Sequence, residues 1–306
     1  MEPIYLEPNL IESVWAGNRL SKIREFTNKN IGIVREVCAY KDMSNIVSSG
    51  IWKGQQIKKV ITDNHDSILG EIPGNELIRV AYMDTAEDLS IQVHPDEENA
   101  KLENDFEKSE SWYILDCHED AYVIAGTYLE TKEALISAIE NQDLDKHIIK
   151  IPVKPGDFVM VPCNLLHACG KNILALEIGS YGGITYRLYD YGRDRPLQIK
   201  KGLEILDLEL RGEKKSYPFE FQGQTIKKNA ISHPLFNVDI LDVESEYTEY
   251  KKNHYHILTS VYGDFLIEID KKEYMLSYTK TLLIPANTKK YTVKGRGRIL
   301  ISYKQI

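Results

Sequence analysis

Three polar side chains alternate with aliphatic ones in the segment LSIQVHP, which begins at Leu89. In an extended strand this alternation places Ser90, Gln92 and His94 together on one face, with apolar side chains on the other. A buried polar face is costly unless its groups find partners, and a metal ion is a strong partner. An imidazole nitrogen and an amide oxygen can both donate to a metal. The pattern therefore indicates a metal site on one face of a strand.

Two further segments carry candidate ligands. Glu110 leads directly into the apolar strand SWYILDC, and Lys108, two residues earlier, shares its face in an extended chain. In the third segment Gly156, Pro162 and His167 are spaced as a strand, a tight turn and a histidine that opens the next element. A single histidine in a strand is more often an ordinary core or surface residue, so the prediction depends on the three segments together.

Short strands must position these side chains. Segments rich in Val, Ile, Tyr and Thr, separated by Gly, Pro and Asn, fill most of the chain after residue 76 and are typical of an all-β barrel or sandwich. Asp96 and Thr131 are each placed to cap a helix. We expect helices at residues 56–69, 97–106, 131–141 and 198–208.

A weak internal repeat predicts two barrels of the same type. KPGDFVMVPCNLLH (154–167) and YTKTLLIPANTKKY (278–291) share the order strand, proline, asparagine and turn. The polar, turn-rich stretch 212–224 reads as a linker. We therefore predict a metal-bearing domain with helical insertions at residues 1–225 and a smaller β domain at residues 226–306.

These motifs together resemble a known family. GDFVMVPCNLLH is similar to the second cupin motif, and with LSIQVHP, SESWYILDC and TYRLYDY (185–191) the chain resembles the zinc-dependent type I mannose-6-phosphate isomerases, in their short bacterial form. The resemblance runs from about residue 5 to residue 306 and implies an all-β-dominated fold: a jelly-roll cupin barrel with helical insertions, and a smaller C-terminal cupin-like barrel.

The resemblance also implies a ligand set and an activity. One zinc ion per chain is held by Gln92, His94, Glu110 and His167, although a mixed site of nitrogen and oxygen donors also suits iron, manganese or cobalt. The implied reaction interconverts mannose 6-phosphate and fructose 6-phosphate by metal-assisted proton transfer through an enediol.

Three residues match catalytic positions of the family: Arg187, Glu177 and Lys108. Arg187 is permanently charged and can fork onto oxygens, although a structural ion pair is the alternative. Glu177 lies in the apolar strand NILALEIG, where a carboxylate is costly unless it is functional or paired, and a salt bridge to Arg187 is the alternative. Lys108 could equally be a solvated surface lysine.

The segments expected to face the substrate depart from the family. Trp15 begins WAG where the family has WGG; GIVR (32–35) replaces GESW; and GSYGG (179–183) lacks the glutamine and aspartate of the usual QxxSD run. Ala81 replaces a family lysine, and Arg79 on the same face could supply the charge. We assign Ser90, Trp15 and Arg79 to substrate binding.

An intact ligand set beside altered substrate segments leaves other functions open. A divergent paralogue could isomerise another sugar phosphate, or bind one without catalysis. An oxygenase or epimerase cupin fits less well, because oxygenase cupins usually present three histidines. In the second barrel, His254 and His256 lack a following glutamate and Tyr291 stands where a histidine would be, so we expect no metal there.

Composition limits the partners. The chain has 306 residues and a net charge of -8, which argues against binding nucleic acid through a general basic surface. Its start lacks a signal-peptide pattern, and no run of about 18 apolar residues occurs. Four scattered cysteines form no CxxC pair and suggest a reducing compartment. We expect a cytoplasmic monomer or homodimer that acts on a small sugar phosphate without membrane or nucleic acid.

Overall fold

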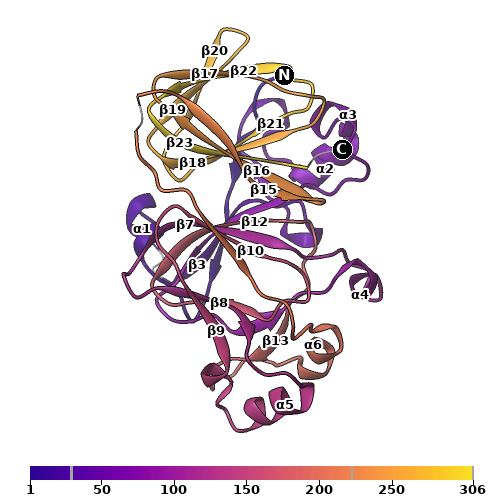
Figure 1. Ribbon diagram of the computed structural model, residues 1–306. Coiled ribbons are helices and arrows are strands. Elements are labelled where there is room, and N and C mark those ends of the chain that lie inside the picture. Colours follow the sequence, from indigo (N-terminus) through magenta and orange to yellow (C-terminus); the bar gives the residue numbers. More distant parts are fainter. Residues whose placement is uncertain (28–29, 222, 305–306) are drawn as a thin grey trace. The chain divides into compact units, whose positions relative to one another are not determined.

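The computed structural model describes residues 1–27, 30–221 and 223–304 (Figure 1). Residue 222 of the expected linker and residues 305–306 of the expected C-terminal domain lie outside the described residues. The chain divides into two compact units. Unit 1 comprises Met1–Asn9, Arg35–Ala81 and Pro218–Ile306, and unit 2 comprises Leu10–Val34 and Tyr82–Tyr217.

This division differs from the expected domains at 1–225 and 226–306, because two early segments group with the C-terminal part of the chain. The backbones of Ile4 and Leu283 exchange hydrogen bonds of 2.8 and 3.1 Å, and Gly70 forms an isolated bridge with His254. Neither pairing leaves a signal in local periodicity. The stretch expected to be a linker contains a strand, β14 (Glu213–Ser216), which pairs with β10 (Asp157–Val161).

Unit 2 carries the strands predicted to hold the metal. They lie in two antiparallel sheets. The five-stranded sheet has the order β13 (Tyr186–Tyr189), β6 (Ile91–Val93), β11 (His167–Cys169), β8 (Tyr122–Thr127) and β9 (Ile148–Pro152). The seven-stranded sheet has the order β14, β10, β7 (Glu110–Cys117), β12 (Ile173–Gly179), β5 (Arg79–Asp84), β3 (Ile31–Val37) and β2 (Asn9–Glu12). The chain passes from one unit to the other within β3 and β5.

The alternation that predicted strands also builds the core of unit 2. Ile91 and Val93 of β6 are buried together with apolar side chains from β8, β11 and β12. Burying such side chains stabilises the fold by roughly 1.5–3 kcal/mol each. The second face of β6 is thereby left for the polar side chains, so the sequence pattern sets which residues face the site.

Helices are few and short. The expected caps are confirmed: Asp96 accepts a hydrogen bond from the backbone of Asn99, and Thr131 accepts one from Ala134. Helix α1 was not expected, and the expected helix at 56–69 is split into α2 and α3. The α-helices are α1 (Arg19–Arg24), α2 (Ile57–Asp63), α3 (His65–Ile68), α4 (Glu97–Lys101), α5 (Lys132–Glu140) and α6 (Ile199–Ile205). Among the described residues, no helix is long and apolar enough to cross a membrane.

Unit 1 has its own pair of sheets and its own core. The first has the order β15 (Ile226–His233), β16 (Phe236–Val243), β23 (Gly297–Tyr303), β18 (His256–Tyr262) and β21 (Thr281–Ile284). The second has the order β17 (Glu246–Tyr250), β22 (Lys290–Gly295), β19 (Phe265–Ile269) and β20 (Lys272–Leu276). β1 (Leu6–Glu7) pairs with β4 (Ile46–Val47). Both repeat segments form a strand, a turn and the start of the next strand, as the internal repeat predicted.

Candidate metal centre

A row of three side chains crosses the five-stranded sheet of unit 2. In the strand register Gln92 of β6 pairs with His167 of β11 on one side and with Arg187 of β13 on the other. Residues directly opposite one another in antiparallel strands point to the same face. His94, two residues after Gln92, follows on that face, so the alternation seen in the sequence is what brings these four residues together.

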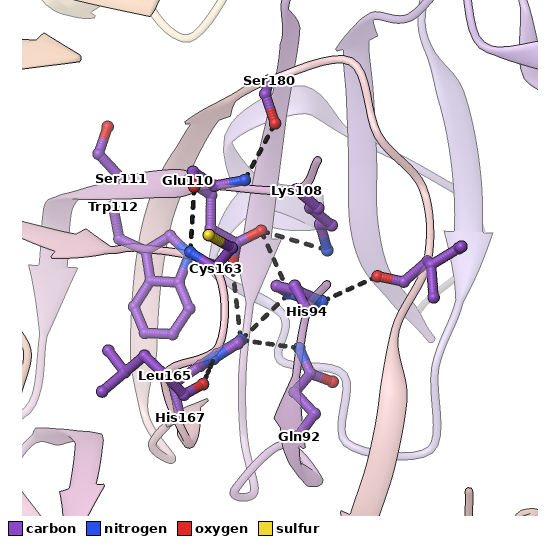
Figure 2. Close-up of polar contacts among 12 residues, drawn as sticks. Gln92, His94, Lys108, Glu110, Ser111, Trp112, Cys163, Leu165, His167 and Ser180 are labelled. Atoms are coloured by element: carbon purple, nitrogen blue, oxygen red, sulfur yellow. Dashed lines mark hydrogen bonds and ion pairs between the residues drawn. The ribbon is translucent and has the colours of Figure 1, made fainter. Parts of the chain in front are cut away.

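Three buried side chains form a cluster that could hold a metal ion: His94, Glu110 and His167 (Figure 2). Nε2 of His94 lies 3.1 Å from Nε2 of His167. The Glu110 carboxylate lies 3.6 Å from the first imidazole and 3.8 Å from the second. Gln92 contributes its amide, whose nitrogen lies 3.3 Å from Nε2 of His167. The structure thus brings all four predicted ligands to one point.

The protonation of both imidazoles favours a cation between them. Nδ1 of His94 lies 2.9 Å from the carbonyl oxygen of Ile184, and Nδ1 of His167 lies 2.8 Å from that of Leu165 (Figure 2). A carbonyl can only accept, so each Nδ1 carries the proton and each Nε2 carries a lone pair.

Burial keeps these rings neutral. Burial, together with the charge of Lys108, lowers the pKa of His94 to about 3. Burial also lowers the pKa of His167 to about 4, against the opposing effect of Glu110. Two lone pairs that face each other at 3.1 Å repel unless a cation lies between them. The donor set therefore fits a metal ion.

Glu110 is held as an anion. Burial alone would raise the pKa of its carboxyl, but opposing effects, the charge of Lys108 foremost, hold that pKa well below its usual range. Nζ of Lys108 lies 3.2 Å from Oε2, and the indole N–H of Trp112 donates to Oε1 at 3.0 Å. Oε2 has this ion pair but accepts no hydrogen bond from the described residues, so it keeps a lone pair that a metal could use.

Gln92 can turn its amide oxygen toward the cluster by a half-turn about its last side-chain bond. Its nitrogen now faces His167, and its oxygen lies 3.5 Å from the hydroxyl of Ser90. A metal ion at the cluster would favour the reversed orientation, because only the amide oxygen can ligate. The amide would then offer its nitrogen to Ser90.

Arg187 is joined to the cluster through Ser90. Its Nε donates to the Ser90 hydroxyl at 3.2 Å, and another guanidinium nitrogen donates to the carbonyl of Pro196 at 2.9 Å. In the part of the chain that the structure describes, no carboxylate forms an ion pair with Arg187. A structural ion pair therefore does not explain this arginine.

Glu177 lies on the face of β12 that carries the site. It pairs with Trp112 of β7, and Gly179 pairs with Glu110, so both acidic side chains share one face of the seven-stranded sheet. Glu177 is half-buried. A Cβ at Gly179 would lie 3.0 Å from that of Glu110, so the glycine leaves room for the ligand.

The structure records other contacts for two of the residues assigned to substrate binding. Trp15 is 4% exposed and belongs to the hydrophobic core of unit 2. Arg79 belongs to unit 1, where its guanidinium lies 5.8 Å from the centre of the Tyr40 ring. Ser90, the third assigned residue, does contact the site through Gln92 and Arg187.

The segment GSYGG supports the strand of Glu110. The Ser180 hydroxyl accepts from the backbone of Ser109 at 3.0 Å and donates to the carbonyl of Glu107 at 2.7 Å. A Cβ at Gly182 would lie 2.1 Å from the carbonyl oxygen of Phe106, so only glycine allows this approach. Ser180 and Gly182, which lie in the segment that departs from the family's QxxSD run, thus support the backbone before Glu110. The sequence alone did not reveal this role.

Two supporting residues were missed by sequence reasoning. Trp112 follows Glu110 by two positions, and strand alternation alone could have placed its indole on the ligand's face. Asn164 adopts a positive φ of 64°, and its backbone N–H donates to the carbonyl of His94 at 2.8 Å. Its side chain donates to Asp96 at 2.9 Å, which ties the turn before His167 to the end of β6.

The two-sheet architecture and the buried histidine–glutamate cluster define a metal-binding protein of the cupin class. The family model for the mannose-6-phosphate isomerase cupin domain matches residues 225–304. A curated relative from Bacillus subtilis, "Probable mannose-6-phosphate isomerase GmuF", is 38% identical over 67% of this chain and 69% of its own length. The chain therefore belongs to the mannose-6-phosphate isomerase family.

Solved structures agree with this assignment. The mannose 6-phosphate isomerase of Bacillus subtilis is 27% identical, covers 99% of both chains and superposes with a TM-score of 0.90. A mannose 6-phosphate isomerase solved with zinc and yttrium is 14% identical and covers 100% of both chains. Its TM-score of 0.77 shows that the fold is shared.

Proposed function

We propose that this chain is an isomerase that interconverts mannose 6-phosphate and fructose 6-phosphate. The observation that carries the proposal is the continuous polar row from Arg187 through Ser90 and Gln92 to His167, in a chain that matches a mannose 6-phosphate isomerase over 99% of its length. A permanent cation and a metal cluster on one sheet face suit a substrate with several oxygens and a phosphate.

The proposed metal is one zinc ion per chain. His94, His167, Glu110 and the reversed amide of Gln92 would hold it, and two imidazoles with two oxygen donors suit zinc. The mannose 6-phosphate isomerase that shares the fold at 14% identity was solved with zinc bound, which supports this choice of metal. When bound, the metal supplies positive charge beside the oxygens of the open-chain sugar.

The chain's own residues handle the proton and the substrate charge. Glu177 takes the proton from one of the two carbons and returns it to the other, as a general base and then acid. Arg187 binds substrate oxygens through the guanidinium N–H groups that are not used by Ser90 and Pro196. Lys108 keeps Glu110 ionised, since its Nζ lies 3.2 Å from that carboxylate. Ser90 orients both Arg187 and Gln92.

The roles of Trp15 and Arg79 in substrate binding stay predictions, as do the monomeric or homodimeric state and the absence of nucleic acid among the partners. A cytoplasmic location is also part of the proposal. It is supported by the cysteines, which are all free thiols: Cys38, Cys117, Cys163 and Cys169. Free thiols suit a reducing compartment.

A coupled assay on mannose 6-phosphate tests the activity. The zinc-loaded protein is expected to form fructose 6-phosphate, and a chelator is expected to abolish turnover until zinc is restored. Metal content is measured on the same samples. Zinc at one ion per chain without any turnover would reject this substrate and favour the alternative of another sugar phosphate or of binding alone.

A further inference from the structure

A second polar pocket lies within unit 1, away from any role assigned above. Its volume is about 180 Å³, well below the ~300–1,000 Å³ of pockets for drug-sized ligands. Three nearly fully buried polar side chains line the pocket: the imidazoles of His254 and His256 and the ammonium group of Lys251. Buried polar groups that line a cavity need partners.

His256 presents a donor to this pocket. Its Nδ1 lies 2.9 Å from the hydroxyl of Tyr291, a residue that is 1% exposed. That hydroxyl is buried and has no other hydrogen-bond partner in residues 1–27, 30–221 or 223–304, so its proton finds an acceptor only if it donates to Nδ1, which places the ring proton on Nε2. This tautomer is the reverse of that at His94 and His167. Tyr291 therefore turns a cupin histidine from a metal ligand into a hydrogen-bond donor.

His254 presents an acceptor. Its Nδ1 lies 3.1 Å from the carbonyl of Tyr255, so Nδ1 carries the proton and Nε2 carries a lone pair. The imidazole stacks on Tyr303, with ring centroids 5.1 Å apart and an interplanar angle of 22°. A donor, an acceptor and an aromatic surface thus meet in one small cavity.

The charges around the pocket nearly cancel. Lys227 pairs with Glu249 at 2.8 Å and with Asp239 at 3.3 Å, and Lys252 supplies a second positive charge. Lys251 donates to two backbone carbonyls at 2.8 Å each. Burial lowers the pKa of Lys251 to about 7, so it adds little charge above neutral pH.

A metal ion fits this pocket poorly. Among the described residues, three side chains of metal-ligand type lie close enough to share an ion at one place, His94, Glu110 and His167 of unit 2. The pocket of unit 1 offers no such group among those residues. Both carboxylates of the second pocket are paired with Lys227, and one of its two imidazoles has no lone pair to offer on the pocket side. An anion would gain little from a pocket whose charges balance.

We propose that the pocket of unit 1 binds an uncharged polyhydroxylated molecule of monosaccharide size. Hydroxyl groups both donate and accept, so they match His256, His254 and the remaining donor of Lys251 in turn. The stacked rings of His254 and Tyr303 offer an apolar wall to the carbon skeleton of a sugar or polyol. The site is separate from the proposed catalytic centre and does not depend on its activity.

NMR spectra of the full-length, zinc-loaded protein, with isotopes incorporated in its histidine side chains, allow a direct test. D-mannose and sorbitol are titrated as probes, with inorganic phosphate as the anionic comparison. We expect saturable shifts of the His254 and His256 ring signals with at least one of the two polyols and no such shift with phosphate. His254→Phe keeps a ring over Tyr303 but loses the acceptor, and is expected to weaken binding about tenfold.

The matched control is His118→Phe, which replaces a half-exposed histidine outside the pocket and should bind as the unaltered protein does. The wild-type titration alone still decides the proposal if His254→Phe does not fold. The proposal is overturned if neither polyol shifts the two signals, if phosphate alone shifts them, or if His254→Phe binds the polyol with unchanged affinity.

Discussion

Proton positions on individual imidazoles separate the two sites chemically. At His94 and His167 a backbone carbonyl holds each Nδ1 proton, so two lone pairs converge. At His256 a tyrosine hydroxyl takes the place of the carbonyl, and the outward nitrogen becomes a donor. The identity of one partner atom therefore decides whether a cupin histidine can ligate a metal.

Glu177→Gln tests the assigned base. The amide keeps the size of the side chain but cannot accept a proton, so we expect kcat to fall by roughly 10²–10⁴-fold. Zinc content should stay unchanged, because Glu177 is not a ligand. Glu140→Gln, at an exposed position in α5, is the control. Full activity of the Glu177 variant would remove this residue from the mechanism.

Trp112→Phe tests how Glu110 is positioned. The variant keeps an aromatic ring but loses the indole N–H that donates to Oε1. We expect zinc affinity to fall about 10–100-fold, as for other groups that orient a metal ligand. Competition with a chromophoric chelator measures the zinc affinity, and His167→Ala is the reference for complete loss of zinc binding. Trp52→Phe in unit 1 is the control; equal affinities for both tryptophan variants would contradict the role.

At the scale of elements, the sequence could predict strand β6 and the caps of helices α4 and α5 more easily than the contacts that support Glu110. Alternation from Leu89 to His94 needs only neighbouring residues, and the Asp96 cap acts within one turn. Support for Glu110 comes from Ser180, whose contact with Ser109 spans 71 positions. A backbone-to-hydroxyl contact of that kind has no residue pattern by which to recognise it.

Ser180→Ala tests that support. Removing the hydroxyl leaves the buried N–H of Ser109 without this partner, which should cost about 1–3 kcal/mol in the free energy of unfolding. Urea denaturation measures the loss. Ser137→Ala, at an exposed position in α5, should change stability by less than ~0.5 kcal/mol. Equal stability of the two variants would show that water replaces the hydroxyl.

At the scale of the whole molecule, the buried imidazoles couple stability to pH. The pKa values of His94 and His167, lowered to about 3 and about 4, mean that the folded, metal-free protein takes up these protons only in strong acid. The unfolded chain takes them up below about pH 6.5. Between about pH 6.5 and pH 4 the unfolded chain therefore binds more protons than the folded protein. Over this range the free energy of unfolding decreases as the pH falls.

Urea midpoints of the metal-free protein between pH 7 and pH 4.5 measure this coupling. A variant with glutamine at both positions, His94→Gln with His167→Gln, should show a smaller decrease over the same range. A midpoint that does not change with pH in the unaltered protein would contradict the neutral, buried state of the two rings.

The order of the chain sets an order of assembly. Every residue of unit 2 has been synthesised by Tyr217, so its metal cluster can close while about the last third of the chain is still absent. Unit 1 has to wait, because Ile4 pairs with Leu283 across 279 positions of sequence. Segments 1–9 and 35–81 thus spend synthesis without their C-terminal partners, exposed to chaperones and proteases. A stalled or truncated chain would leave behind unit 2 with its metal cluster, while the N-terminal segments of unit 1 lack the C-terminal sheets of that unit.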